Sequence, residues 1–235
     1  LAVPLAPLSI QYKDYAAWQR ESLQTSGSTN DSKQYWTAKF EGDLPTLELP
    51  LDYERPEFAD YKGSAKNYVF DSTRTSAIKK TCEDAEVTLF MFLLSMVNIL
   101  LLRRTGQEDI VLGSPIAGRP HNDLEDQIGF YVNMLAFRTK LDPAQSFSQL
   151  LHKVKANTLE AYDHELYPFH QIVEDLNLEA DFSRNNLFDV VVQFQNAKLE
   201  KVKSLKLDDI EVTNFLPNAY SSKFDITFNF EEIDS

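Results

Sequence analysis

Apolar residues recur along the chain with two spacings, one typical of helices and one typical of strands. They run almost without a break through residues 87–102, VTLFMFLLSMVNILLL, which predicts a wholly buried core helix. Residues 146–162 carry a single apolar stripe, and Ser146 and Gln149 predict a capping box at its start. Residues 187–195 alternate apolar and polar positions, as expected of a strand with one buried face. The mixture of helices and strands favours an α/β domain.

Shorter patterns predict the remaining elements. Further helices are expected at residues 8–22, 33–40, 168–176 and after a cap at Asp71 or Ser72. Further strands are expected at residues 67–70, 109–112, 132–137, 210–215 and 224–230. The small polar run 25–32 predicts a linker, and the prolines of residues 44–56 predict an extended strap laid across a surface. We therefore divide the chain into leading helices, linker and strap, residues 1–56, and a C-terminal lobe, residues 57–235.

The connection between two of the expected strands contains the most distinctive residues. The first strand is expected to break at residues 113–115, and an exposed turn at residues 118–120 leads into an acidic helical turn. Asn133 then interrupts an apolar strand, where its amide must find hydrogen-bond partners or face a cavity. It is either a buried Asn bonded to nearby backbone or part of the wall of a substrate channel, together with Tyr131 and Met134.

The charge balance disfavours one class of partner. The chain has 235 residues, with 23 Lys and Arg against 36 Asp and Glu, and a net charge of −13 disfavours a nucleic-acid surface. Cys82 is the only cysteine, so it forms no internal disulfide, and we expect a small semi-buried hydrophobe in a reducing cytoplasm. Residues 87–102 are shorter than the roughly 20 residues that a bilayer span needs, so no membrane association is expected.

No set of side chains matches a self-contained catalytic or metal site. The four histidines lack partners at metal-ligand spacing, and Ser114 lacks glycines at the two offsets of a nucleophile elbow. Glu174 follows His170 at i+4, which is typical of a helical surface pair and less often of a general base. Arg184 precedes a strand, either as a tie between helix and strand or as an anchor for a carboxylate of an adjoining part of the protein.

Four ordered motifs resemble those of one family. They are residues 12–18, YKDYAAW; residues 113–133, which contain GSPIAGR and IGFYVN; residues 164–169, HELYPF; and residues 181–187, DFSRNNL. Together they resemble the motifs of the condensation domains of nonribosomal peptide synthetases, with Glu165 where the family has Gln and Asn186 where Pro is usual. The motifs mark a set of structural residues, namely Trp18, Gly118, Arg119, Gly129, Pro168, Phe169, Ser183 and Arg184.

The resemblance implies a V-shaped pair of lobes, each built like chloramphenicol acetyltransferase, with a mixed sheet flanked by helices. It implies that the domain joins a carrier-bound aminoacyl or peptidyl donor to a carrier-bound amine. No cofactor is expected to bind directly, because phosphopantetheine arrives on peptidyl or acyl carrier proteins. The other implied partners are the N-terminal lobe of the same domain and a neighbouring adenylation domain.

The family's catalytic motif, His-His-x-x-x-Asp-Gly, is absent from these 235 residues. We therefore expect the chain to begin after the first lobe, to stop before the second lobe is finished and to be inactive alone. Two other interpretations stay open. One is a non-catalytic lobe that docks carrier proteins. The other is an epimerisation or heterocyclisation relative, although those carry different residues at positions 132–133 and 167–169.

Overall fold

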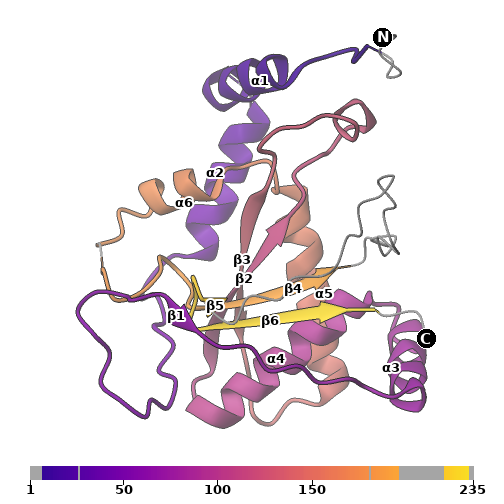
Figure 1. The fold of residues 1–235 in the computed structure, drawn as a ribbon, viewed down its shortest axis with the longest axis vertical. Helices are drawn as coiled ribbons and strands as arrows, with labels where there is room; N and C mark the ends of the chain where they lie inside the picture. The colour runs from indigo at the N-terminus through magenta and orange to yellow at the C-terminus, as the bar shows by residue number, and fades with distance from the viewer. Residues whose placement is uncertain (1–6, 26, 180, 196–219, 233–235) are drawn as a thin grey trace, which may run out of the picture.

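A four-stranded mixed sheet in the order β3-β2-β4-β6 forms the centre of the chain in the computed structural model (Figure 1). The structure describes residues 7–25, 27–179, 181–195 and 220–232. Strand β2 (Asp109–Ile116) pairs antiparallel with β3 (Asn133–Lys140) and parallel with β4 (Val190–Gln195), which pairs parallel with β6 (Ile226–Glu231). A separate two-stranded ladder joins β1 (Lys62–Gly63) to β5 (Tyr220–Ser221).

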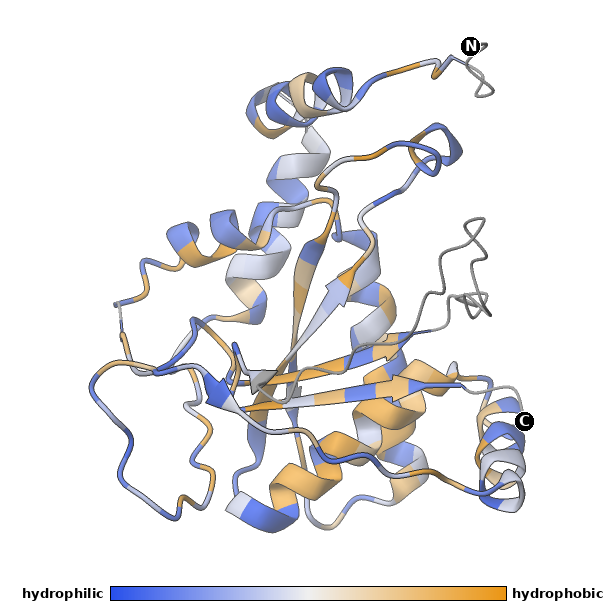
Figure 2. Cartoon of the chain, viewed as in Figure 1, coloured by the Kyte–Doolittle hydropathy of each residue, from blue (hydrophilic) through white to orange (hydrophobic). Residues whose placement is uncertain are grey.

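Two helices, α4 (Leu89–Thr105) and α5 (Phe147–Asp163), pack against each other and against the sheet. The remaining helices are α1 (Tyr12–Thr25), α2 (Gly27–Lys39), α3 (Ser72–Asp84) and α6 (Phe169–Asp175), with a 3-10 turn η1 (Asn122–Leu124). Helix α2 packs on α6, and α6 packs on β3. Figure 2 shows apolar residues concentrated on α4 and on the central strands, while α1 is largely hydrophilic.

The local signals at helix ends are confirmed. Asp71 caps α3, the Ser146–Gln149 capping box begins α5, and Pro168 occupies the N-cap position of α6. Gly42 and Gly106, which follow α2 and α4, have φ of +82° and +73°. These signals depend on a few neighbouring residues, which is why the sequence alone was enough to place them.

The predicted linker at residues 25–32 is wrong, because α2 begins at Gly27. Its small polar side chains are bonded rather than free. Thr29 Oγ1 donates to the Ser22 carbonyl at 2.8 Å, and Ser32 Oγ lies 3.0 Å from His164 Nδ1. These contacts with α1 and with the end of α5 stabilise a helix that composition alone does not favour.

The predicted break at residues 113–115 is also wrong, because β2 continues to Ile116. Gly113 faces Ala136 of β3 in the ladder and packs under an aromatic ring. A Cβ placed there would lie 2.2 Å from Cε2 of Phe188. The glycine therefore makes room for a neighbouring side chain and does not end the strand.

Three further expectations need correction. Residues 67–70 form no strand: they lie extended, and Tyr68 is 85% exposed. The core helix is not wholly buried, since Met96 and Leu100 of α4 are exposed to solvent. The first helix spans Tyr12–Thr25 instead of residues 8–22. The expected strand at residues 210–215 lies outside the described residues.

One buried cluster joins the leading part of the chain to the sheet. Trp36, Phe40 and Leu47 belong to the same cluster as the buried residues of β2 and β3. The extended strap at residues 44–56 is confirmed, because it contains no helix or strand. Among the described residues no single helix has the length and apolarity to cross a bilayer, and the α3–α4 pair that would have the length is bent by 104°.

Candidate functional site

Asn133, the first residue of β3, holds the loop between α5 and α6 through three hydrogen bonds. Its Nδ2 donates to the carbonyl oxygens of Glu165 and Tyr167, both at 2.9 Å. Its Oδ1 accepts from the backbone N–H of Phe169 at 3.0 Å. Both amide hydrogens are therefore used on backbone 32 and 34 residues away. These contacts match the first interpretation from the sequence, an Asn bonded to backbone.

The same loop is fixed from its other side. The buried Tyr167 hydroxyl donates to Asp175 Oδ2 at 2.5 Å. Trp36 Nε1 donates to the His164 carbonyl at 3.2 Å, and the His164 ring stacks on Tyr35. Burial in this loop raises the pKa of Glu165. The HELYPF motif is thus a rigid bridge between α2, α6 and β3.

Tyr131 lies inside an aromatic cluster on α1 and not beside an open channel. Its ring is buried, and its hydroxyl donates to Gln127 Oε1. The guanidinium carbon of Arg119 lies 4.0 Å from the ring centroid, a cation–π contact. The rings of Tyr12 and Tyr15 lie 5.2 and 4.8 Å away. Tyr131 thereby joins the 118–131 loop to the first helix.

Two motif glycines allow this close packing. A Cβ on Gly118 would lie 1.9 Å from the Tyr131 carbonyl oxygen, and the residue has a φ of +62°. A Cβ on Gly129 would lie 2.4 Å from Cδ2 of Tyr12. The turn at Gly118 is therefore buried and not exposed as expected. Arg119 completes the loop by donating to the carbonyls of Leu124 and Gln127.

An apolar edge protrudes from this loop next to Asn133. Ile128 is 98% exposed and Phe130 is 79% exposed, and Val132 is exposed as well. Trp18 of α1 is also exposed, although it packs against Tyr15. Large exposed apolar groups that lie together mark an interaction surface. We call Ile128, Phe130 and Val132 the apolar edge. Met134, which follows Asn133, is half-buried.

Arg184 makes the tie expected of it. Its Nη1 donates to the Leu47 carbonyl at 3.0 Å and to the buried Asp189 carboxylate at 2.9 Å. Its Nη2 lies 3.2 Å from Glu48 Oε1. The neighbouring Ser183 carbonyl accepts from Arg55 Nη1 of the strap at 3.1 Å. The DFSRNN turn therefore clamps the strap onto the entrance of β4.

Arg138, which is buried in β3, was not predicted from the sequence. Its Nη2 lies 2.8 Å from Asp109 Oδ2, and the same side chain donates to the carbonyls of Glu41 and Asp43 at 3.1 and 2.9 Å. A basic residue directly after an apolar run was the available signal. Its carbonyl partners lie 95 to 99 residues away in the leading part, so spacing gave no hint of them.

The family model for the condensation domain matches residues 3–235. The chain belongs to the condensation-domain family. It is 42% identical over 229 residues to one plipastatin synthase of Bacillus subtilis (strain 168), a match that covers 97% of this chain and 9% of that protein. It is 40% identical over 228 residues to tyrocidine synthase 3 of Brevibacillus parabrevis, covering 97% of this chain and 4% of that protein. The condensation domain thus spans less than a tenth of either relative.

Solved structures show the same fold. The X-domain from teicoplanin biosynthesis aligns with 82% of this condensation domain and 44% of its own chain, at 26% identity and a TM-score of 0.74. The complex of the X-domain and OxyB aligns with 100% of this chain and 51% of that chain, at 24% identity and a TM-score of 0.85. The resemblance to condensation domains of nonribosomal peptide synthetases is confirmed, as is an α/β fold of the chloramphenicol acetyltransferase type.

Proposed function

We propose that this condensation domain is the C-terminal lobe of an amide-bond-forming enzyme and is inactive without the N-terminal lobe. The observation that carries the proposal is the extent of the structural match. The whole chain aligns with 51% of one X-domain chain, as expected of one lobe in a domain of two. The sequence agrees, since none of its four histidines is adjacent to another. The catalytic His-His motif must therefore come from another part of the enzyme.

In the proposed reaction the acceptor amine attacks the thioester carbonyl of the donor. The new C–N bond forms, the C–S bond breaks, and the donor's phosphopantetheine thiol is released. Phosphopantetheine arrives on peptidyl or acyl carrier proteins, so no cofactor binds this lobe directly. A neighbouring adenylation domain and a cytoplasmic location belong to the same proposal.

The residues of this lobe act by positioning. Asn133 and the loop that it holds form one wall of the substrate channel, with Met134 beside them. Tyr131 supports that wall from behind, because its ring is enclosed by Arg119 and the α1 aromatics. The apolar edge, with Phe130 as its largest residue, lies next to Asn133 and offers the surface on which the N-terminal lobe packs.

One observation favours a second function, a non-catalytic docking lobe. A structural neighbour, the X-domain from teicoplanin biosynthesis, is described in complex with OxyB. A lobe without the histidine pair would serve in the same way by holding a carrier protein. An epimerisation or heterocyclisation relative is disfavoured by the IGFYVN and HELYPF motifs.

A transfer assay tests the proposal. The chain is measured alone and together with the N-terminal lobe that precedes the matching segment of tyrocidine synthase 3, using carrier proteins loaded with a panel of aminoacyl groups. We expect dipeptide on the acceptor carrier only with both lobes. Changing the second histidine of the added lobe to Ala should lower the rate by about 10²–10⁴. Dipeptide formed by the chain alone contradicts the proposal, and carrier binding without transfer by both lobes supports the docking function.

A further inference from the structure

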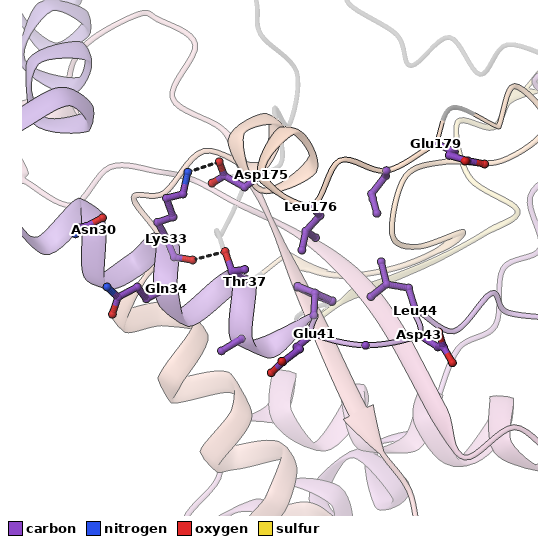
Figure 3. A pocket seen from close by; sticks show the side chains of 14 residues that line it. Asn30, Lys33, Gln34, Thr37, Glu41, Asp43, Leu44, Asp175, Leu176 and Glu179 are labelled. Carbon is purple, nitrogen blue, oxygen red and sulfur yellow. Dashed lines mark hydrogen bonds and ion pairs between the residues drawn. The ribbon is translucent and has the colours of Figure 1, made fainter.

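A groove separate from the apolar edge runs between α2 and the residues that follow α6 (Figure 3). One wall consists of α2 and the turn that ends it, and the other consists of residues 175–179. Its volume is about 1240 Å³. A second cavity of about 180 Å³ shares Leu44, Leu178 and Glu179 with the groove and extends it along the strap. The groove is therefore long and open, a shape suited to a chain segment better than to a small molecule.

The floor of the groove is apolar. Phe40, at its base, is a fully buried member of the main core. Leu44 and Leu176 are partly buried and pack against the same core, and Figure 3 shows them reaching into the groove from opposite walls. Leu178 adds a further half-buried side chain. The floor thus exposes part of the hydrophobic core to whatever fills the groove.

The rim of the groove is acidic. Four carboxylates line it, and Lys33 is the basic side chain among the described lining residues. The charge of Lys33 is already used, since its Nζ lies 2.5 Å from Asp175 Oδ1. Within the described part of the chain, Glu41, Asp43 and Glu179 form no salt bridge. Three carboxylates are therefore available to a positively charged partner.

The wall that carries two of these carboxylates is rigid before any partner binds. Arg138 donates to the backbone carbonyls of Glu41 and Asp43, and Asp109 neutralises the guanidinium. The opposite wall is tied to α2 by the Lys33–Asp175 bridge, drawn as a dashed line in Figure 3. A surface that is already ordered loses little conformational entropy on binding.

We propose that this groove docks an apolar peptide segment of a partner protein, flanked by Lys or Arg. Its apolar side chains cover Leu44, Leu176 and Leu178. Its basic side chains pair with Glu41, Asp43 and Glu179 on the rim. A second copy of this chain is a poorer occupant, because each copy carries a net charge of −13. The groove is built by α2 and α6, so its occupancy is independent of condensation at Asn133.

The test uses the chain and two fluorescein-labelled peptides in anisotropy titrations at low salt. One peptide carries leucine and phenylalanine between pairs of lysines, and the other has glutamates in place of the lysines. We expect only the lysine peptide to bind, with an affinity that falls as salt is added. Amide NMR signals of α2 and residues 175–179 should shift. Absence of binding by the lysine peptide, or equal binding of both peptides, overturns the proposal.

Variants locate the binding. The double change Glu41→Gln and Asp43→Asn should weaken binding of the lysine peptide about fivefold. Leu178→Ser should weaken it independently of salt. The matched control, Glu125→Gln and Asp126→Asn, neutralises two exposed carboxylates of the 118–131 loop and should leave the affinity unchanged. Melting curves verify that each variant is folded. An unchanged affinity in the Glu41 and Asp43 variant, or an equal loss in the control, overturns the proposal.

Discussion

Arg138 and Asp109 form an ion pair across the β2–β3 ladder, with Nη2 and Oδ2 2.8 Å apart. The pair lies at the edge of the core, where the Arg138 side chain is almost fully buried. Its two terminal nitrogens, Nη1 and Nη2, also donate to carbonyls at the end of α2 and in the turn that follows. One strand residue therefore fixes the sheet, the helix end and the wall of the acidic groove together.

Arg138→Lys tests how much this side chain contributes to stability. The substitution should lower the free energy of unfolding by about 1–3 kcal/mol, because an ammonium cannot replace a planar fork that serves several acceptors. Urea denaturation measures the change. Arg104→Lys, at an exposed position in the last turn of α4, is the control and should have no measurable effect. Equal midpoints for the two variants would contradict the role given to Arg138.

Asn133→Ala separates the two interpretations of that residue. The three lost hydrogen bonds leave backbone groups of Glu165, Tyr167 and Phe169 without their partner. We expect a loss of about 1–3 kcal/mol in unfolding free energy. Asn229→Ala, on the exposed face of β6, should cost little. An unchanged stability together with a slower transfer in the two-lobed enzyme would instead support direct contact with substrate.

Gly118→Ala and Gly42→Ala distinguish a steric clash from backbone strain. Both glycines have positive φ, but only Gly118 lies against other atoms, since a Cβ on Gly42 meets nothing within 4 Å. Gly42→Ala should cost about 1 kcal/mol, as expected from the left-handed conformation alone. Gly118→Ala should cost clearly more, because the carbonyl of Tyr131 must move. Thermal melting compares them, and equal costs would show that the loop yields freely.

The pH dependence of stability should change in Glu165→Gln. Burial raises the pKa of Glu165, so the folded chain keeps its proton at a pH where the unfolded chain has lost it. This residue's contribution to stability therefore falls as pH rises from the ordinary glutamate pKa through the raised one. Glu165→Gln should raise the melting temperature at about pH 8 and leave it unchanged at about pH 4. Glu125→Gln is the exposed control, and an equal gain there would refute the effect of burial.

Arg184→Ala should release the strap before it affects anything else. The substitution removes the bonds to Leu47 and Glu48 and leaves the buried Asp189 without its cation. We expect lower stability and faster cleavage by endoproteinase Glu-C at Glu48. Arg103→Ala, in the exposed last turn of α4, provides the comparison. Unchanged cleavage at Glu48 would mean that the strap is held by its apolar residues.

Features set by near neighbours in the chain were predictable. The α5 capping box, the apolar character of α4 and the alternation in β6 each depend on residues a few positions apart. The motifs around Asn133 and Arg184 were sufficient to indicate the family and the fold. The same reasoning failed at Gly27–Lys39, whose helix is stabilised by contacts with α1 and His164.

The sequence by itself thus determined the fold class, most elements and the residues that needed an explanation. Only the tertiary structure decided what those residues contact. The partners of Asn133 lie 32 to 36 residues away, and those of Arg138 lie up to 99 residues away. Periodicity fixes which face of a strand a side chain occupies, but not which distant segment covers that face. The acidic groove has the same origin, because its two walls meet only when α2 packs against α6.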